Sequence, residues 1–173
     1  TDSSAASDVY KRQIENYYNQ KAQEEFPPEF NFFKEFINKY PTIEPYKTEW
    51  KVFDSKSSVA GTIDMVYKKP NGELFIFDWK RTTKLVNDIG TIIKSDFEYG
   101  YDELENLSNN SYNKYCLQQN LYKYILEDNY GEKVSSMNIL VLHPRYHTYF
   151  HLQVPNLIKE TEFLIRKARE KSI

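Results

Sequence analysis

Apolar residues near the start of the chain repeat at helical intervals, and prolines interrupt that pattern. One imperfect stripe predicts a helix over about residues 8–25, which Pro27 and Pro28 end because proline cannot continue a helix. A second stripe predicts a helix that ends near Tyr40 and Pro41. The stripes consist of Val9, Ile14, Tyr17, Tyr18 and Ala22, and of Phe30, Phe33, Phe36 and Ile37.

The middle of the chain changes to short apolar runs that are typical of strands. We expect a strand over residues 50–53 and then the two strands of a hairpin. The second hairpin strand begins with residues 74–77, which are apolar on both faces, as in a central strand. Residues 82–113 are polar and rich in turn formers, which predicts a long excursion over the functional face.

Helical and strand patterns alternate in the last third of the chain. Apolar residues over 113–128 predict a helix, and it is followed by expected strands over 137–143 and 149–154. A closing helix is expected over 156–171. The predicted order is therefore two helices, three strands, the excursion, a helix, two strands and a last helix.

The turn of the hairpin determines which side chains face each other. The segment Lys69-Pro70-Asn71-Gly72-Glu73 predicts a type I turn closed by a glycine bulge, which makes a three-residue loop. Such a loop pairs Lys69 with Glu73 and sets Asp64 opposite Asp78. A two-residue Asn-Gly loop would instead pair Asp64 with Trp79 and turn Asp78 to the other face.

Charged residues gather where the hairpin strands end. Asp78 and Lys80 are two positions apart on a strand, so they share a face, and the three-residue loop brings Asp64 to them. Two carboxylates and an ammonium group on one face indicate a hard-metal site for phosphodiester cleavage. The alternative is an exposed strand end that is held by a salt bridge.

Composition narrows the classes of protein. We expect residues 1–7 to be a disordered tail or the remnant of an expression tag, and residues 8–173 to form a single domain. The net charge of −2 gives no overall basic field, so any contact with nucleic acid must be local. Cys116 is the single cysteine, which excludes a disulfide framework and a site held by several cysteines. No membrane span or signal peptide is recognisable, so a cytoplasmic or nuclear protein is expected.

Three motifs together resemble a known family. Gly61-Thr62-Ile63-Asp64 followed by Phe77-Asp78-Trp79-Lys80 resembles the core of the PD-(D/E)XK nuclease superfamily, in particular its RecB-like exonuclease branch. Gln118 and Tyr122 resemble the Q-x-x-x-Y helix motif of that branch, and the wider match is similar to nucleases of large DNA viruses. The resemblance implies an α/β restriction-endonuclease-like fold, in which helices flank a mixed central sheet.

The resemblance also implies roles for individual residues. Asp64 and Asp78 would be ligands of Mg²⁺ or Mn²⁺, with the backbone carbonyl of Trp79 as a third ligand. Lys80 would orient the attacking water and offset charge on the phosphate. Gln118 and Tyr122 would position the substrate or brace the site, although a half-buried polar pair explains them equally well. Glu49 is an extra ligand, an acid behind the ligands, or a plain surface glutamate.

The chain departs from the family pattern on its first helix. Where the family often has a metal-binding histidine, this chain has Lys11, which cannot bind a metal while protonated. Glu15 of the same motif is present and is a candidate replacement ligand. The single cysteine excludes the iron–sulfur cluster that some relatives hold. His143, His147 and His151 are expected to serve packing, with His147 and His151 on one strand face, rather than to bind metal.

The expected substrate is DNA, with single strands or ends favoured. Arg81 and Lys84 extend the positive charge of Lys80, and Tyr115 is a candidate for stacking on unpaired bases. An exonuclease is the first choice and a structure-selective endonuclease the second, as part of DNA repair or recombination or of a longer helicase or polymerase chain. The competing hypothesis is a nuclease fold that has lost catalysis and binds nucleic acid or serves assembly.

Overall fold

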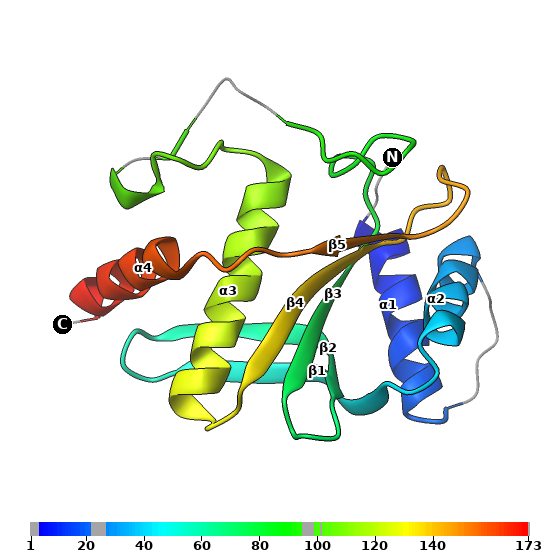
Figure 1. The fold of residues 1–173 in the computed structure, drawn as a ribbon, viewed down its shortest axis with the longest axis horizontal. Coiled ribbons are helices and arrows are strands. Elements are labelled where there is room, and N and C mark those ends of the chain that lie inside the picture. The colour runs from blue at the N-terminus through cyan, green and yellow to red at the C-terminus, as the bar shows by residue number, and fades with distance from the viewer. Residues whose placement is uncertain (1–3, 22–26, 95–98, 101, 173) are drawn as a thin grey trace.

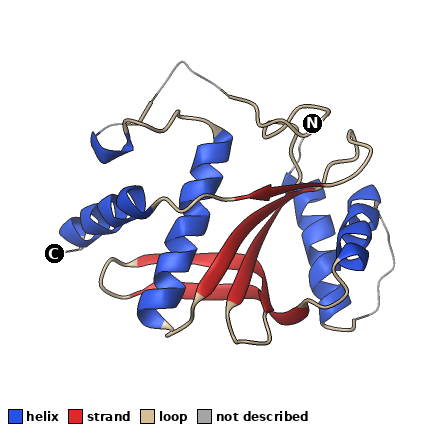
Figure 2. Cartoon of the chain, in the orientation of Figure 1, coloured by secondary structure: helices blue, strands red, loops and turns tan. Residues whose placement is uncertain are grey.

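A twisted sheet of five strands forms the centre of the molecule (Figures 1 and 2). The computed structural model describes residues 4–21, 27–94, 99–100 and 102–172. Neighbouring strands are antiparallel except for the central pair, β3 and β4, which is parallel. In their spatial order the strands are β1 (Glu44–Asp54), β2 (Val59–Lys68), β3 (Leu74–Lys80), β4 (Val134–Val141) and β5 (Phe150–Gln153).

Helices cover both faces of the sheet and create two separate apolar cores. On one face α1 (Ser4–Tyr18) and α2 (Pro28–Lys39) bury an aromatic-rich core against β2 and β3. On the other face α3 (Ser111–Asn129) connects the parallel strands and packs over a more aliphatic core. The helix α4 (Ile158–Lys171) lies beside α3, and a short 3₁₀ helix spans Asp102–Leu104 (Figure 1). None of the described helices is both long enough and apolar enough to cross a membrane.

The predicted order of elements is confirmed, but several boundaries differ. The helix α1 begins at Ser4, four residues before the predicted start at about residue 8, and residues 1–3 lie outside the described part. It ends at Tyr18 instead of continuing toward residue 25, because Gln20 takes a left-handed backbone with φ of 55°. Residues 22–26 are again outside the described part. Strand β1 begins at Glu44, six residues earlier than predicted, because its first half is a polar edge without an apolar pattern.

The hairpin has the predicted three-residue loop. The amide of Lys69 donates to the Glu73 carbonyl at 2.8 Å, and the amide of Gly72 donates to the Lys69 carbonyl at 2.9 Å. Gly72 has a φ of 87°, the left-handed conformation that the bulge requires. The register runs from Lys68 opposite Leu74 to Met65 opposite Phe77, so the next step sets Asp64 opposite Asp78. The alternative two-residue loop is therefore excluded.

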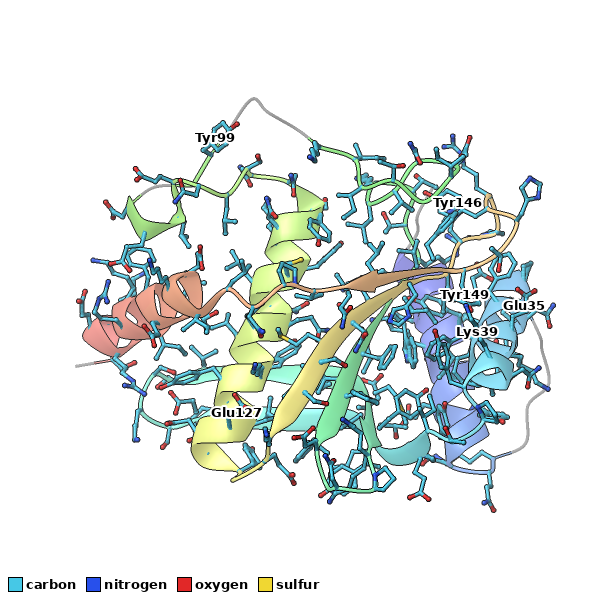
Figure 3. All side chains as sticks on the ribbon, viewed as in Figure 1. Glu35, Lys39, Tyr99, Glu127, Tyr146 and Tyr149 are labelled. Carbon is cyan, nitrogen blue, oxygen red and sulfur yellow. The ribbon has the colours of Figure 1, made fainter. Side chains whose placement is uncertain are left out.

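The segment between β3 and α3 runs past the end of the sheet where the last residues of β3 lie (Figure 1). Its described residues include two isolated bridges, Val86 with Ile92 and Tyr99 with Ser108. The hydroxyl of Tyr146, labelled in Figure 3, donates to the Val86 carbonyl at 2.6 Å and ties this segment to the loop before β5. That loop is itself held to α2, because Thr148 donates to Glu35 at 2.8 Å.

Asp54 is a buried charged residue that holds the β1–β2 turn. Its side chain is 0 % exposed, and it accepts hydrogen bonds from the amide and hydroxyl of Ser57 and from Asn129 at the end of α3. Burial alone would raise the pKa of Asp54, but these hydrogen bonds lower it below its ordinary value. The carboxylate therefore stabilises the fold when it is ionised.

Replacing Asp54 with alanine should reduce the free energy of unfolding by about 2–4 kcal/mol, because several donors lose their charged acceptor. Denaturant titration at pH 7 measures this difference, with the exposed Asp88→Ala as the matched control. Because the folded-state pKa is lowered, the difference should shrink as the pH falls below the ordinary aspartate value of 3.8. A difference below 1 kcal/mol at pH 7 would contradict this account of the turn.

Candidate active site

The carboxyl groups of Asp64 and Asp78 meet where β2 and β3 separate. The last paired residues of these strands are Met65 and Phe77, and the aspartates follow directly beyond them. Both side chains are nearly removed from solvent, with 9 % of Asp64 and 5 % of Asp78 exposed. The two carboxyl groups lie close enough together that each of them shifts the pKa of the other. The predicted aspartate pair is thus present at the predicted place.

Two lysines and one backbone amide contact this pair. Lys80 lies 3.1 Å from Oδ2 of Asp78, as expected for side chains two positions apart on one strand. Lys11, from the distant helix α1, donates to Oδ2 of Asp64 at 3.0 Å. The amide of Trp79 donates to the same Asp64 oxygen at 2.9 Å. Each aspartate therefore has its own ammonium partner, and Lys11 is the one that the hairpin did not predict.

The environment separates the pKa values of the two aspartates. Complete burial raises the pKa of Asp78 well above its ordinary value, and the neighbouring Asp64 carboxylate raises it further. Burial would also raise the pKa of Asp64, but the hydrogen bond from Asp78 and the charge of Lys11 lower it below the ordinary value. The pKa of Asp64 is therefore lowered and that of Asp78 is raised, so Asp78 is the member of the pair that is protonated more readily.

The backbone of Trp79 faces the aspartates. Its amide is directed at Asp64 on the β2 side, and the amide and carbonyl of one strand residue point to the same side. The next carbonyl, that of Lys80, points the other way and accepts from the Leu142 amide beyond β4 at 2.8 Å. The Trp79 carbonyl is therefore oriented toward the β2 side, as its predicted role requires.

Helix α3 contributes Tyr122 and Tyr115 to the site. The hydroxyl of Tyr122 lies near the backbone of Thr62, and its pKa is raised by burial and then by the charges of Asp78 and Asp64. The Tyr122 ring lies directly against the backbone of Gly61. A residue with a Cβ atom at position 61 would collide with the ring. The ammonium of Lys80 lies over the Tyr115 ring, 4.2 Å from its centre.

The two adjacent glutamines of α3 have different environments. Gln118, which the motif selected, is half-buried. Gln119 is fully buried, and neither its carbonyl oxygen nor its amide nitrogen has a hydrogen-bond partner among the described residues. Sequence reasoning missed Gln119. The helical pattern could have identified it. Cys116 and Ile125 mark the side of this helix that faces the core, and only one of two neighbouring residues can lie on that side.

Glu49 approaches the pair from β1 in a strained conformation. Its neighbours Thr48 and Trp50 pair with Met65 and Ile63, which places Glu49 across from Asp64. Its φ is 46°, a left-handed value that is uncommon for a residue with a side chain and that concentrates at functional sites. Burial, followed by the charge of Asp64, raises the pKa of Glu49 to about 7.

Glu15 also lies in this region, close enough for its charge to contribute to the raised pKa of Glu49. Within the described ranges, however, no three His, Cys, Asp or Glu side chains come close enough together to hold a metal ion. The predicted ligands Glu15 and Glu49 are therefore near Asp64 but are not gathered with the aspartates into one ligand group. The charged partner of the Asp64 carboxylate is instead the ammonium group of Lys11.

The predicted substrate-binding residues do not converge. Arg81 forms an ion pair with Glu29 of α2 at 2.6 Å and is only 14 % exposed, because it follows Lys80 and points to the opposite face. Lys84 is exposed in the loop after β3, and Tyr115 is engaged with Lys80. Of the three, Lys84 is the residue whose side chain faces solvent most fully.

The three histidines lie on β5 or between β4 and β5. His151 on β5 is 2.8 Å from Asn138 and packs beside Phe36 and Phe77. His147 lies in the loop before β5, so the prediction that it shares a strand face with His151 is wrong. The strand predicted over residues 149–154 is present as β5, Phe150–Gln153, which is one residue shorter at each end.

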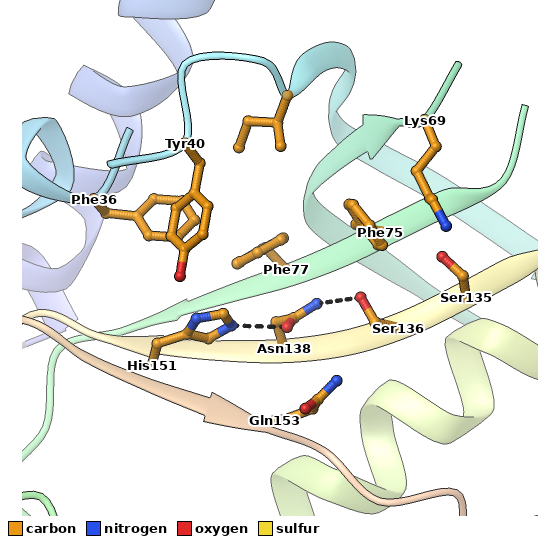
Figure 4. A pocket seen from close by; sticks show the side chains of 11 residues that line it. Phe36, Tyr40, Lys69, Phe75, Phe77, Ser135, Ser136, Asn138, His151 and Gln153 are labelled. Carbon is orange, nitrogen blue, oxygen red and sulfur yellow. Dashed lines mark hydrogen bonds between the residues drawn. The ribbon is translucent and has the colours of Figure 1, made fainter. Parts of the chain in front are cut away.

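A cavity of about 350 Å³ lies on the sheet face opposite Asp78 and Lys80 (Figure 4). Phe75 and Phe77, which alternate with Asp78 along β3, line it together with Tyr40 at the end of α2. Among its polar side chains, Asn138 bonds to His151 and to Ser136. This cavity is therefore separate from the carboxylate pair.

Comparisons with known proteins support the fold but not a family. No family model matches the chain, and no curated protein matches it. Among solved structures, it is similar to a protein from Eubacterium rectale named "Putative exonuclease". The identity is 15 %, the TM-score is 0.53, and the match covers 100 % of this chain and 71 % of that protein. The predicted α/β restriction-endonuclease-like fold is thereby confirmed, and the chain shares it with a nuclease-like protein.

Proposed function

We propose that this chain is a metal-dependent nuclease of the PD-(D/E)XK superfamily that hydrolyses DNA phosphodiester bonds, with exonuclease action favoured. One observation carries the proposal: a buried aspartate pair at the ends of two central strands, with Lys80 bonded to Asp78. Burying two neighbouring carboxyl groups is costly even when each has a lysine partner, so their position at a strand end suggests a functional role. The similarity to a protein named "Putative exonuclease" is consistent with this proposal.

The residues present fit a divalent cation in part. Asp64 and Asp78 lie beside each other, each shifting the pKa of the other, and the Trp79 carbonyl is oriented toward the same side. Oxygen ligands of this kind suit Mg²⁺ and Mn²⁺, and these three groups would hold the ion. A bound ion would polarise the phosphodiester and promote formation of the attacking hydroxide. Lys11 on Asp64 is the element that does not fit.

The other groups would act on the substrate directly. Lys80 is held between Asp78 and the Tyr115 ring, so its ammonium is fixed in direction and can orient water or neutralise a phosphate oxygen. Tyr122 packs against Gly61 beside the pair and would brace it. Lys84 would contact the DNA backbone from the adjacent loop. With a net charge of −2, recognition depends on such local contacts.

Cleavage of end-labelled DNA tests the proposal. With Mn²⁺ or Mg²⁺ present, we expect single-stranded DNA to be shortened progressively from one end, and chelation by EDTA should stop the reaction. Substrates labelled at the 5′ or the 3′ end report the polarity, and a circular single strand separates exonuclease from endonuclease action. If no linear or circular DNA is cut with either metal, the catalytic proposal fails.

A second candidate function is a nuclease-fold domain that binds nucleic acid or serves assembly without cleaving it. The ion pair between Lys11 and Asp64 favours this candidate, because it satisfies the carboxylate without a metal. The same DNA samples separate the two functions. Retarded migration of single-stranded DNA without cleavage would support the binding domain, whereas metal-dependent cleavage would support the nuclease.

A further inference from the structure

We propose that Lys11 sets the metal affinity of the site, because its ammonium group occupies the Asp64 carboxylate that a divalent cation would need. This inference rests on the proposed function, since it concerns the same carboxylate pair. The resemblance places Lys11 where the family often has a metal-binding histidine, but it implies no role for the lysine itself. The proposed role is that of a built-in competing cation, which makes the site bind metal weakly and only after Lys11 has been displaced.

The contact of Lys11 is specific and well held. Its nitrogen lies 3.0 Å from Oδ2 of Asp64, and its side chain is 25 % exposed, so the ammonium is directed inward. The flanking residues Tyr10 and Ile14 are 0 % and 1 % exposed and anchor α1 in the aromatic core. The helix therefore holds Lys11 over the aspartate, and the contact does not depend on a freely moving surface side chain.

Competition follows from geometry and charge. Asp64 Oδ2 already accepts from both Lys11 and the Trp79 amide, so an ion that bound this oxygen would have to displace a donor. The ammonium groups of Lys11 and Lys80 also repel a further cation at close range, and burial strengthens that repulsion. The Trp79 amide is fixed in the backbone. Lys11 is consequently the group that must move.

Isothermal titration calorimetry with Mn²⁺ alone measures the metal affinity and tests the inference without any cleavage assay. Lys11→Met removes the ammonium but keeps an unbranched side chain of similar length. We expect this variant to bind Mn²⁺ at least tenfold more tightly than the parent chain. Arg12→Met is the matched control, because it removes one positive charge from the adjacent, exposed position of α1. It should bind Mn²⁺ as the parent does.

Two further variants make each outcome decisive. Lys11→Arg keeps the charge and should show no gain, and Lys11→Gln replaces the methionine variant if circular dichroism shows that the latter is unfolded. Equal Mn²⁺ affinity of Lys11→Met and the parent, with weaker binding by Asp78→Asn, would overturn the role of Lys11 and leave the proposed function standing. An equal gain in Arg12→Met would also overturn it, because bulk charge would then explain the effect.

The remaining outcomes separate the inference from the function. Tight Mn²⁺ binding by Lys11→Met with none by the parent would support the inference and would count against metal-dependent cleavage by the parent chain. An absence of Mn²⁺ binding by both proteins would overturn the inference together with the metal part of the proposed function.

Discussion

Replacing Asp78 with asparagine should reduce DNA cleavage about 100-fold or more while leaving the fold at least as stable. The carboxylate is a proposed metal ligand and the partner of Lys80, and loss of one preorganised charged group at such a site typically costs this much. The asparagine side chain keeps the shape of the aspartate, its amide can donate to the neighbouring Asp64, and its oxygen can still accept from Lys80. Shape and hydrogen bonds are thus preserved, and only the charge is lost.

The pH dependence of stability gives this variant an independent signature. Burial raises the folded-state pKa of Asp78, so this residue contributes stability at low pH that is lost as the pH rises. Asparagine does not titrate. Thermal unfolding of Asp78→Asn should therefore match that of the parent near pH 4 and occur at a higher temperature than the parent at pH 8.

The exposed Asp88→Asn is the matched control, because it removes the same charge from a side chain that is 73 % exposed. It should cleave DNA and unfold as the parent does. Cleavage that persists in Asp78→Asn at the parental rate would rule out the aspartate pair as the catalytic centre. A strongly destabilised Asp78→Asn would instead contradict the pKa direction on which the pH signature rests.

Replacing Gly61 with alanine should lower the free energy of unfolding by about 1–3 kcal/mol, the usual cost of overpacking a core. A Cβ atom at this position would lie 2.9 Å from the hydroxyl oxygen and 3.0 Å from Cζ of Tyr122, with a still closer contact to Cε1. The ring would have to move, and Tyr122 stands beside both aspartates. Cleavage should fall about 10- to 100-fold, because small displacements at an active site are costly.

A double-variant cycle identifies the cause of the Gly61 effect. In a Tyr122→Ala background the added methyl group has room, so Gly61→Ala should cost less than half of what it costs in the parent chain. Chemical denaturation of the four proteins measures the coupling. If Gly61→Ala is equally destabilising in both backgrounds, contact with Tyr122 is not the reason for the glycine.

The local pattern was sufficient for the hairpin because its information lies within one short segment. A proline, an asparagine and a glycine in consecutive positions specify the loop, and the loop length determines the register. The pairing of Asp64 with Asp78 and the shared face of Asp78 and Lys80 then follow from strand geometry alone. The order of helices and strands was predictable for the same reason, since periodicity is a local property.

Boundaries and partners of charged residues were less predictable. Arg81 was expected to contact the substrate. Consecutive residues of an extended segment point to opposite faces, however, so Arg81 faces away from Lys80 and forms an ion pair with Glu29 of α2. Glu49 follows no pattern that reveals its left-handed backbone. Gln119 was overlooked beside Gln118 because the motif identifies residues by their spacing in the sequence. Burial of Gln119 depends instead on which side of α3 packs against the sheet.

The amino-acid sequence by itself determined the element order, the hairpin register and the aspartate pair with Lys80, because each depends on residues that are neighbours along the chain or across one turn. Only the tertiary structure decided that Lys11, 53 positions before Asp64, binds the same carboxylate as the Trp79 amide. That contact depends on how α1 packs on the sheet, through burial of Tyr10 and Ile14 against residues far away in sequence. Packing of this kind carries no local signature, and here it determines the charge around the site.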